Sequence, residues 1–278
     1  MSEITAAKVK SFRERTGLPL MDCKQALTEA GGDEDQAYEL LRKRGETLGN
    51  KRADRETAFG RFGLYFGIDK PAGAIVELKC ESAPVTQNEE FIKLANSMAQ
   101  AVATASGEVL DAESLLKLTS PSDAKVTIGE QMAELFNRIR EKFEVGRIAK
   151  LTGATGGYSH NSGTVAGVLL QIEGGSAEAA KDVAMHIVAM RPEAMTKEEL
   201  NPELVAKERE LLKAAALQEG KPEAIVEKMV EGRLRQFVAE KVLLEQPFVK
   251  DDKQTVAQYM KDSNMQIKKF VFYVLGQA

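Results

Sequence analysis

The stretch FGLYFGIDKPAGAIVELKC, residues 62–80, decides the fold. Its two ends, 62–66 and 74–80, are rich in aromatic and aliphatic residues, and two glycines and a proline lie between them. Strand-prone runs joined by such a segment are typical of an antiparallel hairpin. Apolar residues then recur at helical spacing over 91–105, which predicts a helix that covers the hairpin.

A second copy of this pattern starts with GYSHNSGTVAGVLLQI, residues 157–172, and a helix is expected over 180–188. Each copy also has a candidate third strand far along the chain, at 142–151 for the first copy and at 266–275 for the second. The sequence therefore predicts an α+β fold made of two similar units, each a small antiparallel sheet covered by helices.

The other segments are predicted to be helical. Apolar residues at 23, 26, 27 and 30 mark one face of a helix near the N-terminus. Another pair of helices reads as an antiparallel hairpin whose second helix is apolar on more than one side, so packing on the body, on a partner or on a second copy of itself stays open. The expected parts are a three-helix N-terminal domain at 1–45, a linker at 46–60, the first repeat at 61–151, the second repeat at 152–200 and 244–278, and the inserted helical hairpin at 201–243.

The composition excludes several classes of protein. The chain has 278 residues, with 38 Lys and Arg against 42 Asp and Glu, whereas a nucleic-acid coat needs a clear basic surplus. The N-terminal residues form no apolar signal segment, and the longest uncharged run, 151–172, is too rich in glycine and polar residues to span a membrane. We therefore expect a cytoplasmic protein that contacts neither nucleic acid directly nor a membrane.

Few residues could carry catalysis or hold a metal. The two cysteines, Cys23 and Cys80, are far apart in sequence, and the two histidines are His160 and His186, which is too little for a zinc site. The glycine-rich run 153–157 lacks the Lys-Ser or Lys-Thr of a phosphate loop. His186 is expected to be a half-buried structural residue, and His160, beside a hairpin turn, to be exposed. We therefore predict no cofactor and no catalytic residue, and an interaction protein in place of an enzyme.

Several segments resemble one known family. They are RTG at 15–17, MDCKQAL at 21–27, EKMVEGR at 227–233 and QPFVKDD at 246–252. The chain is similar to bacterial elongation factor Ts over essentially its whole length. The resemblance implies a guanine-nucleotide exchange factor whose partner is elongation factor Tu, the GTPase that delivers aminoacyl-tRNA to the ribosome. It also implies an N-terminal bundle similar to ubiquitin-associated domains, a duplicated core and a protruding helical hairpin.

The resemblance further implies which residues contact the GTPase. They are Leu20, Met21 and Lys24 of the N-terminal domain, and Ser82, Ala83, Pro84, Val85, Ile128, Gly129 and His160 of the core. In the family, the segment that matches 80–85 reads CQTDFV, and its Asp-Phe pair inserts beside the magnesium site of the GTPase. Residues 82–85 are therefore expected to displace that magnesium.

This chain departs from the family at that segment, because it reads CESAPV. Ala83 stands where the family has Asp, and Pro84 stands where the family has Phe. Pro84 still offers a rigid apolar ring, which predicts that the loop occupies the magnesium-side cleft. The alternative is that His160 and the N-terminal contacts drive exchange from the phosphate and base sides. Two other functions compete with exchange: a scaffold that binds the GTPase or a ubiquitin-like ligand, and an enzyme, which the missing phosphate loop disfavours.

Overall fold

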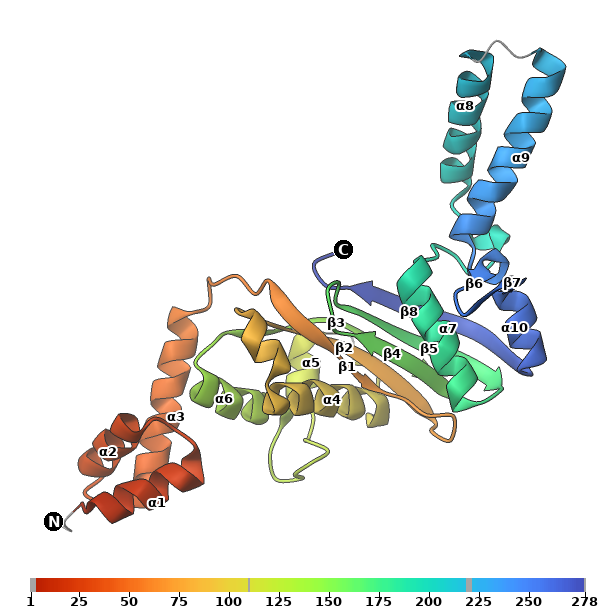
Figure 1. Cartoon of the computed structure of the whole chain (residues 1–278). Helices are drawn as coiled ribbons and strands as arrows, with labels where there is room; N and C mark the ends of the chain where they lie inside the picture. The colour runs from red at the N-terminus through yellow and green to blue at the C-terminus, as the bar shows by residue number, and fades with distance from the viewer. Residues whose placement is uncertain (1–3, 110, 219–221, 278) are drawn as a thin grey trace.

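Figure 1 shows the computed structural model, which describes residues 4–109, 111–218 and 222–277. The molecule is elongated, with a helical bundle at its N-terminal end, two sheets in the middle and a pair of long helices that projects from the far end. Residues 1–3, which form part of the N-terminus expected to lack a signal segment, lie outside the described residues. Residues 219–221, the expected turn of the helical hairpin, also lie outside them.

Three helices form the N-terminal bundle: α1 (Ala6–Thr16), α2 (Leu20–Glu29) and α3 (Glu34–Lys51). The Thr5 side chain caps the start of α1, and Gly17 ends that helix with a φ of 68°, a left-handed conformation that glycine adopts without strain. Phe12 and Cys23 are fully buried in the bundle core. Cys23 therefore has the packing role expected from the sequence.

Helix α3 continues to Lys51, into the stretch expected as a linker. Residues 52–58 then connect it to the first strand. Its C-terminal part packs beside helix α6 (Ile128–Ile139) of the first repeat, and tertiary packing of this kind stabilises helical turns that sequence propensity alone would leave marginal.

The first repeat forms a three-stranded antiparallel sheet in the order β1-β2-β3, from the strands Phe59–Tyr65, Ala72–Cys80 and Phe143–Thr152. Its other helices are α4 (Glu89–Thr104), the short α5 (Ala112–Leu116) and the 3₁₀ helix η1 (Ala83–Gln87). Val76 and Leu78 of β2 point to one face of the sheet and pack in one cluster with Phe91 and Met98 of α4. The expected hairpin, helix and distant third strand are confirmed.

The second repeat has the same plan, with the strands Thr155–His160, Ala166–Gly174 and Met265–Val274 in the order β4-β5-β8. Helix α7 (Ala177–Met190) covers the face of β5 that carries Val168, Leu170 and Ile172. The short strand pair β6 (Pro247–Phe248) and β7 (Asp251–Thr255) was not expected, and neither was helix α10 (Val256–Asp262). Phe248 is buried and stacks on Tyr259 of α10 at 4.2 Å between ring centroids.

The two sheets meet through the faces that their helices leave free. Phe62, Ile75, Leu151 and Leu169 are buried together between the sheets, and strands of one sheet contact strands of the other. A polar pair shares this interface, because the Arg147 guanidinium binds the Glu77 carboxylate at 2.9 Å and also donates to a main-chain carbonyl of β8. The two repeats therefore share a core.

Helices α8 (Pro202–Gln218) and α9 (Glu223–Lys241) form the expected hairpin, which projects away from the sheets in Figure 1. Ala216, Val226 and Val230 are buried between the two helices. Leu211 and Leu217 are exposed on the outside. None of the described helices is long and apolar enough to cross a membrane.

Candidate partner-binding surface

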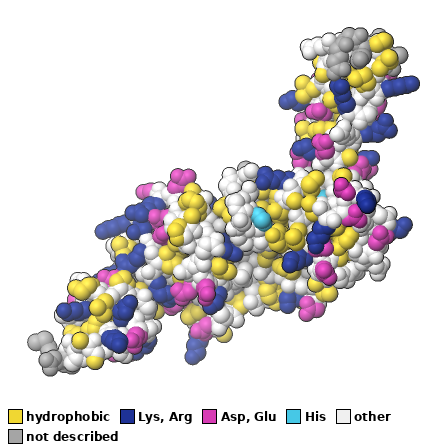
Figure 2. Space-filling model, viewed as in Figure 1, with side chains coloured by type: hydrophobic (Ala, Val, Ile, Leu, Met, Phe, Trp, Pro, Cys, Tyr) yellow, Lys and Arg dark blue, Asp and Glu magenta, His cyan; other side chains and the backbone are white. Residues whose placement is uncertain are grey.

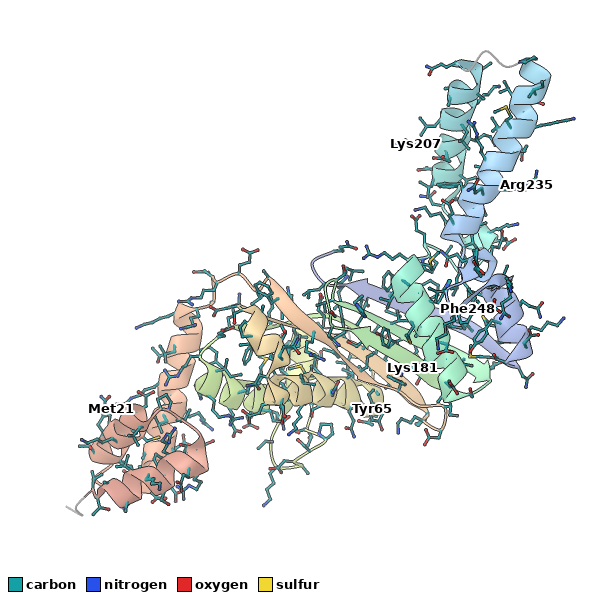
Figure 3. All side chains as sticks on the ribbon, viewed as in Figure 1. Met21, Tyr65, Lys181, Lys207, Arg235 and Phe248 are labelled. Atoms are coloured by element: carbon teal, nitrogen blue, oxygen red, sulfur yellow. The ribbon has the colours of Figure 1, made fainter. Side chains whose placement is uncertain are left out.

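The first part of the candidate site is the outer face of α2. Leu20 and Met21 are large apolar side chains that are 49% and 69% exposed, and Lys24 lies exposed one turn later. Figure 3 labels Met21 on this helix, at the N-terminal end of the molecule. Cys23 on the opposite face is fully buried, as the helical spacing predicted, so α2 has a packed face and a free apolar face. We call Leu20, Met21 and Lys24 the α2 surface.

The second part is the connection between β2 and α4. Ala83 and Pro84 are exposed, whereas Val85 is 7% exposed and belongs to the core of the first repeat. Ala83 begins η1, and Pro84 lies in its first turn, where a missing N–H costs nothing. The exposed tip of the loop is therefore Ala83 and Pro84, and Val85 anchors it in place of reaching a partner.

Hydrogen bonds hold this tip from several sides. The Glu141 carboxylate accepts from the Ser82 backbone N–H (3.0 Å) and from its hydroxyl (2.6 Å). Burial raises the pKa of the Cys80 thiol to about 12, so the thiol stays protonated and donates to the Ser82 carbonyl (3.3 Å). Arg61 of β1 donates to the Thr86 carbonyl (2.9 Å). The loop is thus preorganised before any partner binds.

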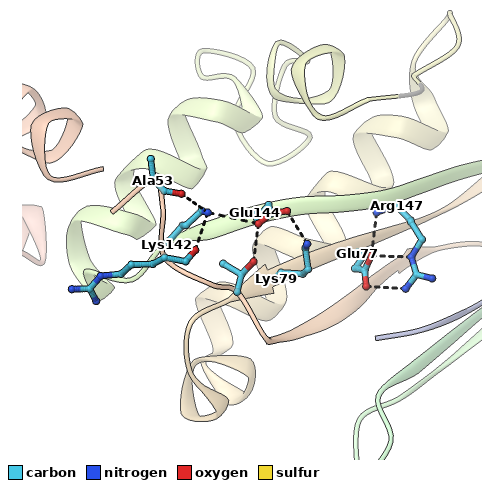
Figure 4. A network of polar contacts seen from close by, with 8 residues as sticks. Ala53, Glu77, Lys79, Lys142, Glu144 and Arg147 are labelled. Atoms are coloured by element: carbon cyan, nitrogen blue, oxygen red, sulfur yellow. Dashed lines mark hydrogen bonds and ion pairs between the residues drawn. The ribbon is translucent and has the colours of Figure 1, made fainter. Parts of the chain in front are cut away.

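Glu81, directly before the loop, forms ion pairs with two arginines of the segment that follows α3. Arg55 donates to its carboxylate at 2.8 Å and Arg52 at 3.3 Å, and the Lys142 backbone N–H donates at 2.6 Å. Burial by itself raises the pKa of Glu81, but the bonds from Lys142 and Arg55 outweigh it and leave the pKa below its ordinary value. Figure 4 shows the adjoining contacts, in which the Lys142 ammonium binds the carbonyl of Ala53.

His160 is the last residue of β4 and is half-buried, so the expectation that it would be exposed is wrong. Its Nδ1 lies 3.1 Å from the Tyr158 hydroxyl, and the two rings are 6.0 Å apart. The neighbouring Ser159 hydroxyl donates to the Phe62 carbonyl of β1. Because Arg61 of the same strand binds Thr86 of η1, β1 contacts both the end of β4 and η1.

Ile128 does not form part of any surface. It is the first residue of α6, is fully buried, and belongs to the core of the first repeat. Thr127 and Glu130 form a capping box that fixes this helix start, which turns Ile128 inwards. Gly129 is half-buried and a Cβ there would lie 2.9 Å from the Leu116 carbonyl. The structure therefore gives Ile128 a packing role in place of the contact that the resemblance implies.

The sequence analysis gave the segment that follows α6 no role in the candidate site. Residues 140–142 contact α2, the loop and the stretch after α3 in turn.

His186 was expected to be half-buried but is fully buried. Its Nε2 lies 2.9 Å from Gln246 Oε1, and its Nδ1 accepts from the Val249 N–H (3.1 Å). Burial lowers the pKa of His186, so its neutral form uses both ring nitrogens.

Among the described residues, neither an exposed thiol nor a cluster of metal ligands lies at this surface. Both cysteines are buried, and no group of three or more His, Cys, Asp or Glu in the described ranges could hold a metal ion. Figure 2 shows the face of the molecule that is also in view in Figure 1. Hydrophobic side chains gather over the middle of that face, while both signs of charge are spread over its ends.

Comparison with known proteins decides the family. The family model described as elongation factor TS matches residues 84–277. The chain belongs to the elongation factor Ts family. Relatives named elongation factor Ts include that of Azoarcus sp. (strain BH72), 41% identical over 100% of this chain and 92% of the relative, and that of Methylococcus capsulatus (strain ATCC 33009 / NCIMB 11132 / Bath), 41% identical over 99% and 93%. That of Bordetella petrii is 40% identical over 100% of this chain and 93% of the relative.

The regions that align with the family include both parts of the candidate site. The family model begins at Pro84, but the elongation factor Ts relatives align with essentially the whole chain, and hence with the α2 surface. The α+β architecture with N-terminal helices agrees with this membership. Elongation factor Ts proteins act in translation elongation, so the chain is placed among the proteins of protein biosynthesis.

Proposed function

We propose that the chain is a guanine-nucleotide exchange factor that binds elongation factor Tu in its GDP form. It promotes GDP release by disturbing the magnesium and phosphate site, so that GTP can rebind, and it catalyses no covalent reaction. The observation that carries the proposal is the exposed Ala83-Pro84 tip, which a member of this family presents on a loop held by Glu141. The cytoplasm is the expected location.

Exchange of this kind rests on differential binding. An exchange protein that prefers a GTPase conformation with a weakened nucleotide site lowers the affinity of the GTPase for nucleotide. Bound nucleotide lowers the affinity of the GTPase for the exchange protein by the same ratio. A tip that displaces the elements around the magnesium ion is enough for this. The Pro84 ring is smaller than Phe, but a proline ring on a preorganised loop loses less conformational entropy when it inserts.

The α2 surface supplies a second contact with the same partner. Leu20 and Met21 are the exposed apolar side chains that a binding hot spot needs, and Lys24 adds a charge at the edge. The division of labour that we propose is that the α2 surface contributes affinity, whereas the loop tip and His160 act on the nucleotide site.

Release of a fluorescent GDP analogue from elongation factor Tu, followed by stopped flow, tests the proposed function. Addition of the protein should accelerate release in proportion to its concentration until the complex saturates. Measurable binding with unchanged release would instead identify a scaffold, and conversion of nucleotide by the protein alone would identify an enzyme. Either result contradicts exchange activity.

A double substitution of Leu20 and Met21 by Asp tests the α2 surface. Charging an apolar hot spot should weaken the complex by about 2 kcal/mol or more. The helical content should not change, because the packed face of α2 carries Cys23. Calorimetric titration measures the affinity and circular dichroism measures the fold. A variant that binds with wild-type affinity would remove α2 from the proposal.

A further inference from the structure

Three consecutive residues between α6 and β3 each bind a different part of the candidate site. We propose that Arg140, Glu141 and Lys142, the junction, fix the distance and orientation between the α2 surface and the Ala83-Pro84 tip, so that both engage one partner molecule at once. These are positioning residues, since they touch other parts of this chain. The effect on partner binding rests on the proposed function, whereas the geometry rests on the contacts of these three residues.

Arg140 joins the junction to the bundle. It caps the C-terminus of α6 with a φ of 64°, a left-handed conformation that is uncommon outside glycine and asparagine. Its guanidinium forms an ion pair with Asp22 of α2. Asp22 directly follows Met21, so this contact holds the α2 surface itself.

Glu141 joins the junction to the loop. Both of its carboxylate oxygens accept from Ser82, one from the backbone N–H and one from the hydroxyl. Bonds of a carboxylate to two donors of one residue fix orientation as well as distance. Ser82 directly precedes the exposed tip, so Glu141 holds the loop one residue from Ala83.

Lys142 joins the junction to the connection between bundle and core. Its ammonium donates to the carbonyls of Ala53 (2.6 Å) and Arg55 (2.9 Å), and its backbone N–H donates to Glu81 (2.6 Å). Glu81 in turn binds the side chains of Arg52 and Arg55. The path of the chain from α3 into the first sheet is therefore tied to the base of the loop.

Direct packing of the bundle on α6 supports the same arrangement. The Tyr38 hydroxyl of α3 donates to Glu134 (3.2 Å). Gly45 of α3 lies so close to α6 that a Cβ there would be 1.8 Å from Asn137 Oδ1. A glycine at a close helix approach, together with the bond between Tyr38 and Glu134, indicates one defined docking geometry.

Fixed geometry matters because two contacts on one partner act as a bivalent ligand. Once the first contact forms, the second binds at an effective concentration set by the connection between them, and the gain is lost when the geometry does not match both sites. A loose junction would therefore weaken the complex without removing any residue that touches the partner.

The double variant Arg140→Asn/Glu141→Ala tests the proposal. Asn keeps the left-handed backbone accessible, and both charged contacts are removed. Affinity for elongation factor Tu should fall about tenfold or more, as expected for partial loss of bivalency. The damage caused by Leu20→Asp should also become smaller in this background than in the wild-type chain. Wild-type affinity, or an undiminished effect of Leu20→Asp, would overturn the proposal.

Two variants serve as controls. Glu173→Ala removes a carboxylate from an exposed ion pair with Lys268, in the second sheet, and should leave affinity unchanged. Asp22→Ala removes the carboxylate that the Arg140 guanidinium binds, so it tests the junction from the bundle side even if the double variant does not fold. Affinity that falls equally in Glu173→Ala would show a general effect of lost surface charge and overturn the proposal.

A distance measurement needs no partner and separates the two proposals. Spin labels at Gln25→Cys in α2 and Gln87→Cys in η1 report the separation of the two surfaces, and the natural cysteines are both buried. A narrow distance distribution should broaden in the Arg140→Asn/Glu141→Ala background. A distribution that stays narrow would overturn the junction even if exchange is observed. Broadening without any exchange would keep the junction and remove the proposed function.

Discussion

The two repeats share a plan but differ in how the central strand leads into its helix. In the first repeat, residues 81–88 include a 3₁₀ helix and an exposed proline before Asn88 caps α4. In the second, Gly174 and Gly175 turn the chain with φ of 70° and 71°, and Ser176 caps α7 at once. One connection presents a surface, whereas the other only reverses the chain.

This difference teaches that the two sheets form a common frame, whereas the connections and insertions differ between the repeats. The insertion of each repeat lies between its helix and its last strand: α5 and α6 in the first repeat, the hairpin, the short strand pair and α10 in the second. The first repeat thereby acquires the helix on which the bundle docks. The second acquires a projection that points away from it.

The largest effect is expected from breaking the interface between the repeats. Glu77→Ala leaves the Arg147 guanidinium without its carboxylate between the sheets, where Glu77 is 4% exposed. Removing one partner of a buried pair costs about 3–5 kcal/mol of the free energy of unfolding. Urea unfolding measures the loss. Glu173→Ala, which breaks an exposed pair, should cost below about 1 kcal/mol, and equal losses would contradict a shared core.

The next effect concerns the tight turn of the second repeat. Gly174→Ala places a Cβ 2.4 Å from the Asn264 carbonyl, at a φ of 70°. Gly163→Ala has nearly the same φ, 69°, but nothing within 4 Å. The second variant should cost about 1–2 kcal/mol for the left-handed backbone, and the first should cost more because the clash adds to it. Thermal unfolding compares them, and the reverse order would contradict the role given to this turn.

A smaller effect is expected from the open connection of the first repeat, and it falls on activity. Pro84→Gly, with Ala83 unchanged, should slow GDP release from elongation factor Tu about tenfold, or about 1.4 kcal/mol of transition-state stabilisation. Stopped-flow release measures it. Pro121→Gly, at an exposed position between α5 and α6, is the control. Release at the wild-type rate would transfer exchange to His160 and the α2 surface.

The smallest effect is expected on the pH dependence of the unfolding free energy, through His186 of α7. Burial holds the pKa of His186 below its ordinary value of 6.5. Below that pH the unfolded chain binds more protons than the folded chain, so the contribution of His186 to stability falls as pH falls. His186→Gln should flatten the pH dependence of the unfolding free energy between pH 7 and 5. Identical slopes in the two proteins would contradict a neutral His186.

Local patterns predicted most of the helices and strands, and the buried face of α2. Helical spacing in α2 separates buried Cys23 from exposed Leu20 and Met21, because amphipathic period reports burial directly. The bounds of α4 and β3 lie within about two residues of the expected ones, whereas α3 continues past its expected end. Where the prediction rested on resemblance alone, as for Ile128, it gave a position in the chain but no information on which way the side chain points.

Contacts between distant segments could not be read from the sequence. Asp22 and Arg140 are 118 positions apart, and nothing in their local context marks them as partners. The packing of the two sheets is equally non-local: Glu77 in a strand reads as a solvent-facing residue until Arg147 and the second sheet cover it. Periodicity specifies which face is apolar, and tertiary packing decides what covers it.

The base of the helical hairpin has a consequence for how this chain tolerates change. Ala194 and Val242 form a parallel bridge, and the Glu193 N–H binds the Lys241 carbonyl at 2.8 Å, so the chain leaves the second repeat and returns to it at one place. The entropy of closing such an excursion grows only with the logarithm of its length, about 0.6 kcal/mol for each doubling. The two helices can therefore lengthen, shorten or receive foreign sequence at little cost to the sheets, which makes this base a natural site for grafting a new domain.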